Sequence, residues 1–365
     1  SRESSATSLG DLLPTASVRG LAFIHISLRA LDFHIGKARV LKCLFADASQ
    51  GQLVALMGES GSGKSTLLNV LGGRSGYGEI SVASKGAKDE PHSLASLSDT
   101  DPIKHPMLLN SAPFEPRRLK ALVGFVPQAH IIFKELTVYE NLVYASQMRA
   151  ESTMTVDTRM RLVEMSLDLL GLQECRHFVC DPSLGERLSG GQLRRIGIGI
   201  ELVCHPPIML LDEPTSALDA VNTRLVITAL KDLTKRGILV IASLHQPRET
   251  VFKMFDKLWL MRKGELAYGG MVTEAIPHFA SLGYPLNLGN PADFFIEVCF
   301  GMVCGEAGAV PVEEIGNRWK MKAARDQAKE KRLAGWALES QALETRKKAT
   351  RRLLRAMFLK ELRNR

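Results

Sequence analysis

The apolar positions of the chain fall into short runs whose spacing changes along the sequence. Between residues 20 and 57, three stretches alternate or run apolar as strands do, and the last of them covers residues 53–57. From residue 138 to about residue 172 the apolar residues recur with helical spacing. Two more short apolar runs, 208–211 and 238–242, contain β-branched residues. Strands that alternate with helices predict an α/β fold, with a mostly parallel sheet flanked by helices.

Polar segments separate these runs and suggest where ordered structure ends. Residues 1–18 form a polar tail without the apolar core of a secretory signal. Residues 84–106 are polar and interrupted by proline, which predicts a mobile loop inserted between two strands. No window reaches the 18 consecutive apolar residues of a membrane span. The six cysteines form no C-x-x-C pair, so reduced thiols are the simplest interpretation.

Composition and charge change this picture in one respect. An apolar content of 45% and a charged content of 24% indicate a folded chain with a full core. The net charge of +8 is uneven, because residues 317–365 hold 16 Lys and Arg against 5 Asp and Glu. The remaining residues are slightly acidic. The basic character therefore belongs to the C-terminal segment and does not indicate nucleic-acid binding by the main domain.

Residues 58–66, GESGSGKST, follow the apolar run 53–57 and carry the first chemical hypothesis. They fit G-x-x-x-x-G-K-[ST], with Gly58, Gly63, Lys64 and Ser65 at the fixed positions. Glycines let backbone N–H groups approach a ligand, and the helix predicted from Lys64 points its positive end at the same place. Lys64 would reach the β- and γ-phosphates of a nucleotide, and Ser65 would hold Mg²⁺. A flexible Gly/Ser turn is the alternative.

Two acids follow the run 208–211. Asp212 is placed to bind Mg²⁺ directly or through water, and Glu213 could polarise an attacking water as general base. A helix N-cap or a solvated turn is the alternative for both. Ligands of parallel sheets bind beyond the carboxyl ends of the strands. Because loop 58–66, Asp212 and His245 all follow predicted strands, we expect them to converge on one site.

The segment LSGGQLRR, residues 188–195, is the most specific motif. Ser189 precedes two glycines and a helical stretch, which predicts a second helix N-terminus able to bind an anion. An ordinary capped helix is the alternative. In the company of the other motifs, this segment resembles the signature sequence of ABC-type ATPases.

The resemblance to ABC-type ATPases covers roughly residues 20–300. Residues 58–66 look like the Walker A loop, 188–192 like the signature, 208–212 like Walker B, and 216–219 like the D-loop. Gln128 looks like the Q-loop glutamine that contacts Mg²⁺, and His245 like the switch histidine that contacts the γ-phosphate. The resemblance implies a P-loop NTPase core with an antiparallel β subdomain and a helical signature subdomain at about 129–195.

The resemblance also assigns roles to individual residues. The implied catalytic residues are Glu213, His245, Lys64 and Gln128. The implied Mg²⁺ ligands are Ser65, Gln128 and Asp212. An aromatic ring that stacks on adenine is expected on the early strands, where Phe33 is a candidate and the spacing also permits Leu31. The implied ATP-binding residues are Gly58, Glu59, Ser60, Gly61, Ser62, Gly63, Lys64, Ser65, Thr66, Ser189, Gly190, Gly191, Gln192 and Asp219.

Several segments narrow the resemblance to the G (White/eye-pigment) subfamily of ABC transporters. They are GIGIEL (197–202), HQPRETVFKMFDKLWLM (245–261), GELAYGG (264–270), HFASLGY (278–284) and, above all, NPADFF (290–295). The last also reads as a capped helix start, with Asn290 as N-cap and Pro291 at the first helical position, and both interpretations can hold. Gln192 departs from the Glu that many G members carry there.

The G-type resemblance implies a domain order and partners. It predicts a polar tail at 1–18, the nucleotide-binding domain at 19–300, and at 301–365 a basic linker and amphipathic helix leading toward an absent transmembrane domain. ATP would bind between the phosphate loop of one copy and the signature helix of a second, in a homo- or heterodimer. The implied function is ATP-driven export of a lipid, sterol or other hydrophobic substrate, with the ATPase domain on the cytoplasmic side of a membrane.

The C-terminal residues 349–365 place apolar side chains on one helical face and arginines elsewhere. This pattern predicts an interfacial membrane helix, and an exposed helix or coiled-coil piece is the alternative. Two rival functions remain: a soluble ABC ATPase acting on ribosomes or DNA, and a regulatory ABC domain that binds ATP without hydrolysing it. Soluble members usually carry two cassettes or long coiled coils, which are not evident here. The presence of Lys64, Asp212, Glu213 and His245 argues against the regulatory rival.

Overall fold

The computed structural model describes residues 23–82, 105–113, 122–129, 131–149, 154–181, 183, 188–286 and 289–329. The predicted polar tail at 1–18 and the predicted amphipathic helix at 349–365 lie outside these residues, as does all but the end of the loop predicted at 84–106. In the described part of the chain, no helix has the length and apolar character needed to cross a bilayer.

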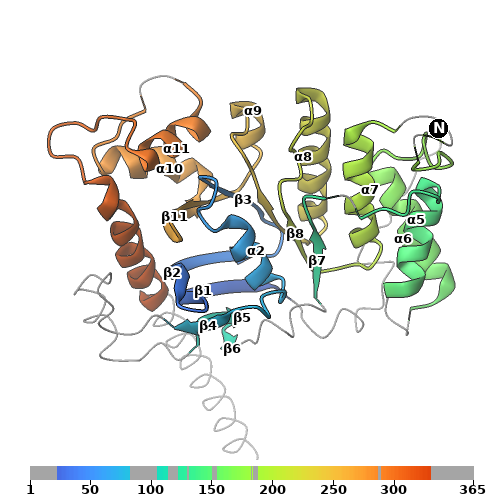
Figure 1. Cartoon of the computed structure of the whole chain (residues 1–365), viewed down its shortest axis with the longest axis horizontal. Coiled ribbons are helices and arrows are strands. Elements are labelled where there is room, and N and C mark those ends of the chain that lie inside the picture. The colour runs from blue at the N-terminus through green and yellow to red at the C-terminus, as the bar shows by residue number, and fades with distance from the viewer. Residues whose placement is uncertain are drawn as a thin grey trace, which may run out of the picture.

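A six-stranded sheet forms the centre of the molecule, and its strand order is β11-β10-β3-β9-β8-β7 (Figure 1). Neighbouring strands run parallel from β10 to β7, and only the edge strand β11 is antiparallel, which confirms the predicted mostly parallel sheet. Every residue of β3, β8 and β9 is buried, as expected of strands covered on both faces. The bounds are β3 Leu53–Gly58, β7 Val123–Val126, β8 Ile208–Leu211, β9 Leu239–Ser243, β10 Lys257–Arg262 and β11 Glu265–Met271.

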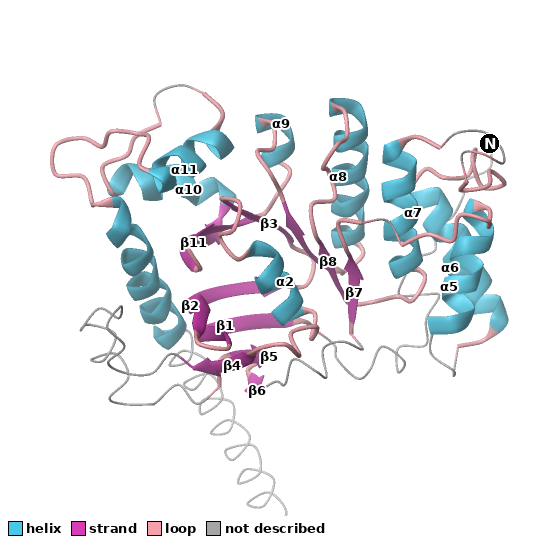
Figure 2. Ribbon diagram, viewed as in Figure 1, coloured by secondary structure: helices cyan, strands magenta, loops and turns pink. Residues whose placement is uncertain are grey.

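A second, antiparallel sheet has the order β2-β1-β5-β6, with β4 also paired to β1. Its strands are β1 His25–Ile35, β2 Ala38–Ser49, β4 Glu79–Val82, β5 Met107–Leu109 and β6 Ala112–Pro113. The helix α2, Lys64–Leu71, contacts both β2 and β3 and so lies between the two sheets (Figure 2). The loop before α2 begins at the end of β3 and stays exposed at Ser60 and Gly61.

The remaining helices form two groups (Figure 1). A helical subdomain at one end of the molecule contains α5, α6 and α7, and the helical spacing read from residue 138 onward is confirmed there. The other helices pack near the parallel sheet. Their bounds are α5 Val138–Arg149, α6 Val156–Leu169, α7 Gly190–Leu202, α8 Ala220–Lys235, α9 Glu249–Phe252, α10 Val272–Ser281 and α11 Pro291–Phe300. Asn290 accepts a hydrogen bond from the Ala292 N–H and Pro291 follows it, so the predicted helix start is confirmed.

One more helix, residues 312–329, packs against both sheets. The Trp319 indole donates to the carbonyl of Phe45 on β2 at 3.1 Å, and the Lys320 ammonium pairs with Glu265 on β11 at 2.9 Å. Trp319 belongs to the same hydrophobic core as the sheets. Apolar burial in the described residues thus continues past residue 300, at Ile315, Trp319 and Ala323.

Candidate active site

The loop between β3 and α2 has a backbone that only glycine adopts easily. Gly58, Gly61 and Gly63 have positive φ angles of 146°, 78° and 102°. A Cβ on Gly58 would lie 2.2 Å from the carbonyl oxygen of Met261, so any side chain there would displace the backbone of β10. Gly63 is the N-cap of α2, which begins at Lys64 as predicted. The helix N-terminus and the loop amides therefore face a common point, as anion binding requires.

The Lys64 side chain folds back over the loop. Its ammonium donates to the carbonyl oxygens of Gly58 and Glu59, both at 2.8 Å, and the residue is only 7% exposed. Burial lowers the pKa of Lys64 below its ordinary value, while the negative charges of Glu213, Asp212 and Glu59 oppose that shift. Those opposing charges place Lys64 within electrostatic reach of the two acids. Lys64 and the two acids follow the carboxyl ends of strands in the same parallel sheet.

The phosphate loop is also braced from outside, by the turn between β10 and β11. The N–H of Gly264 donates to the carbonyl of Ser62 at 3.0 Å, and its own carbonyl accepts from the N–H of Lys42 on β2 at 2.8 Å. A Cβ on Gly264 would lie 2.2 Å from the carbonyl oxygen of Val40. This turn ties the loop to both sheets, and nothing in the loop motif itself indicated it.

The two acids after β8 are held by a residue that the sequence motifs did not single out. Ser243, the last residue of β9, is fully buried, and its hydroxyl donates to Asp212 Oδ1 at 2.7 Å. The same hydroxyl accepts from the Glu213 N–H at 2.7 Å. The backbone of Asp212 donates to the carbonyl of Val126 on β7 at 2.9 Å. Both acids are half-buried directly after the carboxyl end of β8, where ligands of parallel sheets bind.

Gln128 and Arg194 complete this cluster. The Gln128 side-chain amide donates to Glu213 Oε2 at 3.0 Å. Arg194, buried in α7, donates to the backbone carbonyls of Pro127 at 2.8 Å, Gln128 at 3.0 Å and Glu213 at 3.1 Å. Arg194 was not predicted as a site residue, although it stands only two positions after the signature glutamine. It connects the signature helix to the Q-loop and to Walker B of the same chain.

The three predicted metal ligands offer oxygen atoms, which are the donors that Mg²⁺ prefers. Ser65 is exposed at the start of α2. Ser243 occupies Oδ1 of Asp212, and among the described residues no hydrogen bond reaches its Oδ2. Gln128 uses its amide nitrogen toward Glu213, which leaves the amide oxygen for another partner. The donor chemistry of these residues fits a magnesium ion bound together with a triphosphate.

The signature segment forms the N-terminus of α7. Ser189 and Gln192 make a capping box: the Gln192 N–H donates to the Ser189 hydroxyl at 3.2 Å, and the Ser189 N–H donates to Gln192 Oε1 at 2.8 Å. A Cβ on Gly191 would lie 2.4 Å from Asn222 Oδ1, so glycine permits close packing against α8. Among the described residues no hydrogen bond joins residues 188–192 to residues 58–66. The signature and the phosphate loop of one chain are therefore separate parts of the structure.

Asp219 and His245 line a separate hollow of about 660 Å³ beside α8 and α9. Asp219 is the N-cap of α8 and accepts from the Asn222 N–H at 2.8 Å, and these hydrogen bonds lower the pKa of its carboxyl. His245 is exposed two residues after β9. Both side chains are exposed, and in the described part of the chain no hydrogen bond joins either of them to the phosphate loop.

Neither candidate for adenine stacking offers a face to a base. Phe33 and Leu31 are both fully buried. The ring of Tyr77 lies edge-on to Phe33 with centroids 5.8 Å apart, and a Cβ on Gly78 would lie 2.4 Å from Phe33 Cζ. Both candidates are therefore wrong, because residues 77–78 cover this part of β1.

Comparison with known proteins agrees with these motifs. The family model of the ABC transporter matches residues 41–216, and the model of the ABC-2 type transporter matches residues 245–360. The chain belongs to the ABC transporter family. Among its ABC relatives, cbiO1 of Clostridium perfringens, described as part of the ABC transporter complex cbiONQ, has a TM-score of 0.55 and 21% identity. That match covers 69% of this chain and 90% of cbiO1, and it confirms the fold class.

The relatives of this ABC protein belong to the G subfamily, as predicted. ABC transporter G family member 25 of Oryza sativa subsp. japonica is 34% identical over 76% of this chain and 26% of its own length. The broad substrate specificity ATP-binding cassette transporter ABCG2 of Sus scrofa is 37% identical over 68% and 34%. Protein white of Drosophila melanogaster is 33% identical over 77% and 37%. The chain thus spans about a quarter to a third of the length of these relatives.

Proposed function

We propose that this chain is the ATP-binding and ATP-hydrolysing domain of a G-subfamily ABC transporter. One observation supports this most directly: Lys64, Asp212, Glu213 and Gln128 converge at the carboxyl ends of β3, β8 and β7, around a glycine loop that can hold phosphates. Its relatives are transporters, so the energy of hydrolysis would drive transport. The cargo class that fits this subfamily is a lipid, sterol or other hydrophobic compound.

In this proposal each residue has a defined task. The loop amides and Lys64 bind the phosphates, and Ser65, Asp212 and Gln128 hold Mg²⁺, which neutralises charge on the triphosphate when it is bound. Glu213 orients and deprotonates the attacking water, and His245 contacts the γ-phosphate. Gln128 donates to Glu213 and thereby fixes the direction of the carboxylate.

The second half of the ATP site would come from another copy. Ser189 and Gly190 are exposed at the start of α7, and within the described ranges no hydrogen bond joins them to the phosphate loop of the same chain. A second ABC domain, identical or homologous, would supply that helix end, with Asp219 at the same interface. The membrane domain would lie in the same or a partner chain, with this domain on the cytoplasmic side.

The experiment that tests hydrolysis is Glu213→Gln. Glutamine keeps the shape and the hydrogen bond from Gln128 but cannot accept the proton, and a general base contributes about 10²- to 10⁴-fold. We expect the ATPase rate to fall by such a factor while ATP affinity, measured by fluorescence titration, stays within about twofold. Glu249→Gln is the matched control, since Glu249 lies on α9 in an exposed pair with Lys253. Full turnover in Glu213→Gln would remove Glu213 from the mechanism as the general base.

Membrane contact through residues 349–365 is a separate part of the proposal. The excess of Lys and Arg and the apolar stripe in that segment suit an anionic bilayer surface. We expect deletion of these residues to lower binding to anionic liposomes in a flotation assay, while ATP binding is unchanged. Equal flotation of the shortened and full chains would instead favour an exposed helix.

A further inference from the structure

Ser243 makes two short hydrogen bonds in opposite directions with the two acids of the site. Its hydroxyl donates to Asp212 Oδ1 and accepts from the Glu213 N–H, both at 2.7 Å. The residue is fully buried at the end of β9, so water cannot replace either bond. The hydroxyl therefore donates to one residue and accepts from the next, and both residues directly follow the neighbouring strand β8.

The backbone explains why a side chain is needed at this place. The parallel pairing of β8 with β9 ends at Leu211 opposite Ala242, which sets Ser243 beside Asp212. Beyond that point the chain leaves the sheet, and Glu213 has a φ of 47°, in the left-handed region that is unfavourable for residues other than glycine. Its N–H can no longer find a backbone carbonyl of the sheet. The Ser243 hydroxyl supplies the missing acceptor and helps to hold this conformation.

The same hydroxyl limits how the Asp212 carboxylate can rotate. Ser243 donates to Oδ1, and among the described residues no hydrogen bond reaches Oδ2 of Asp212. Glu213 is fixed at its backbone by Ser243 and Arg194 and at its carboxylate by Gln128. Asp212 and Glu213, which have different tasks in the proposed reaction, are thus both held by Ser243.

We infer that Ser243 is a positioning residue that holds Asp212 for metal binding and Glu213 for activation of water. This inference rests on the proposed ATPase function. A hydrogen bond to a charged carboxylate is among the stronger ones, and removing one partner leaves the other without that bond. Both acids lose orientation when this hydroxyl is removed, so metal-dependent binding and turnover change together.

The test is Ser243→Ala, which removes one oxygen atom and adds no bulk. We expect kcat to fall on the order of 10- to 100-fold, as the loss of charge-assisted hydrogen bonds implies. The second measurement is ATP affinity in Mg²⁺ and in EDTA. We expect the gain in affinity on adding Mg²⁺ to shrink about 10-fold, while affinity in EDTA is unchanged, because the phosphate loop is intact. Ser243→Thr restores the hydroxyl and should recover most of both quantities.

Ser166→Ala is the matched control. Ser166 is equally buried, and its hydroxyl donates to the carbonyl of Leu162 within α6, outside the site. We expect it to leave kcat and the Mg²⁺ effect unchanged. Equal losses in Ser166→Ala and Ser243→Ala would overturn the inference, and so would an unchanged Mg²⁺ effect in Ser243→Ala. Failure of the ATPase proposal itself shows separately, as the absence of ATP turnover in the unmodified chain.

Discussion

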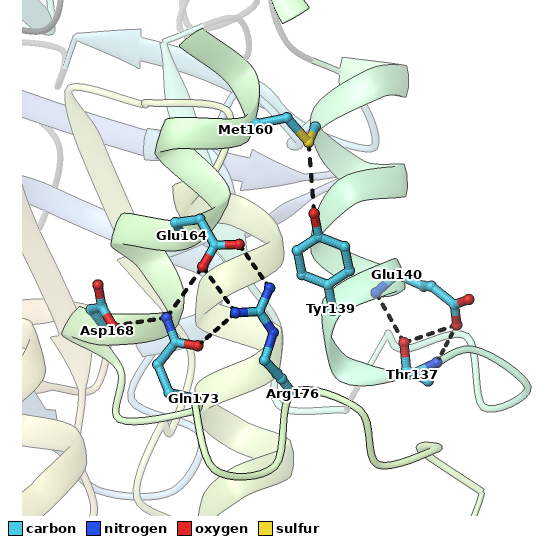
Figure 3. A network of polar contacts seen from close by, with 8 residues as sticks. All are labelled: Thr137, Tyr139, Glu140, Met160, Glu164, Asp168, Gln173 and Arg176. Carbon is cyan, nitrogen blue, oxygen red and sulfur yellow. Dashed lines mark hydrogen bonds and ion pairs between the residues drawn. The ribbon is translucent and has the colours of Figure 1, made fainter. Parts of the chain in front are cut away.

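The nucleotide site and the helical subdomain are held together by different kinds of contact. In the site, the buried side chains of Lys64, Arg194 and Ser243 bond to backbone atoms or to a half-buried carboxylate. In the helical subdomain, Figure 3 shows a network of partly exposed side chains between α5, α6 and the loop that follows α6. There Arg176 makes two hydrogen bonds to Glu164, at 2.7 and 3.1 Å, and lies 4.7 Å from the centre of the Tyr139 ring.

The comparison shows which kind of contact contributes more to the stability of the fold. Partly exposed ion pairs contribute only about 0–1 kcal/mol each, because water competes for both partners. Buried bonds to backbone carbonyls have no such competitor, and their loss leaves unsatisfied groups. Two buried side chains of α7 connect the helical subdomain to the sheet: Arg194 reaches the site, and Glu201 accepts from the N–H of Phe125 on β7. The exposed Arg149 of α5 also binds Glu201. The position of the signature helix therefore depends on a few buried bonds.

The largest effect in this comparison should come from Lys64→Ala. It removes the cation of the phosphate loop and the bonds to Gly58 and Glu59, and charge-assisted phosphate contacts are about twice as strong as neutral ones. We expect ATP affinity to fall by about 100-fold or more in equilibrium titration. Lys253→Ala, in an exposed pair on α9, is the control. Affinity like that of the unmodified chain would show that the loop does not bind phosphate through Lys64.

An intermediate effect should come from Arg194→Met. Methionine fills a similar volume but leaves the carbonyls of Pro127, Gln128 and Glu213 without this donor. We expect the free energy of unfolding to fall by about 2–4 kcal/mol in denaturant titration, and turnover to fall more than ATP affinity. Arg195→Met is the control, because Arg195 on the same helix bonds to Leu170 and Gly191 instead.

The Arg194 comparison is sharpest when the two methionine variants are measured side by side. Turnover lost equally in both would mean that helix stability alone matters, and that the link from α7 to Gln128 and Glu213 has no part in catalysis.

The smallest effect should come from Arg176→Gln in the network of Figure 3. Because Arg176 and Glu164 are partly exposed, we expect a loss of less than about 1 kcal/mol at pH 7. The hydrogen bond from Arg176 lowers the pKa of Glu164 below its ordinary value of 4.5, so this contribution is present at neutral pH and is lost as the pH falls below that value. Thermal melts at pH 7 and pH 3 measure the difference. A loss at pH 7 as large as that of Arg194→Met would remove the distinction between the two regions.

Much of this architecture could be predicted from local patterns. The strands at 53–57, 208–211 and 238–242, the helix start at Lys64 and the capped helix at Ser189 were all confirmed, because each is specified by residues next to one another in sequence. Parallel strand order then brings Asp212 and Gln128 together, since both follow neighbouring strands. The family and its subfamily were confirmed for the same reason: short motifs carry them.

The contacts that were not predicted join residues distant in sequence. Ser243 meets Asp212 only through the register of β8 and β9, and Gly264 meets Ser62 only through the pairing of β10 with β3. A serine at a strand end or a glycine in a turn has no distinctive local pattern. Phe33 failed as an adenine candidate because Gly78, far along the chain, covers it. The roles of the individual site residues toward ATP remain predictions.

Helix 312–329 has a practical consequence for anyone who expresses this domain alone. The Trp319 ring lies 4.9 Å from the Tyr268 ring, and a Cβ on Gly269 would lie 3.1 Å from it, so the indole covers the edge strand β11. A recombinant fragment cut at residue 300, where the family motifs end, would uncover this aromatic surface beside an open strand. Such surfaces promote aggregation and edge-to-edge pairing. A soluble fragment should therefore extend at least to residue 329.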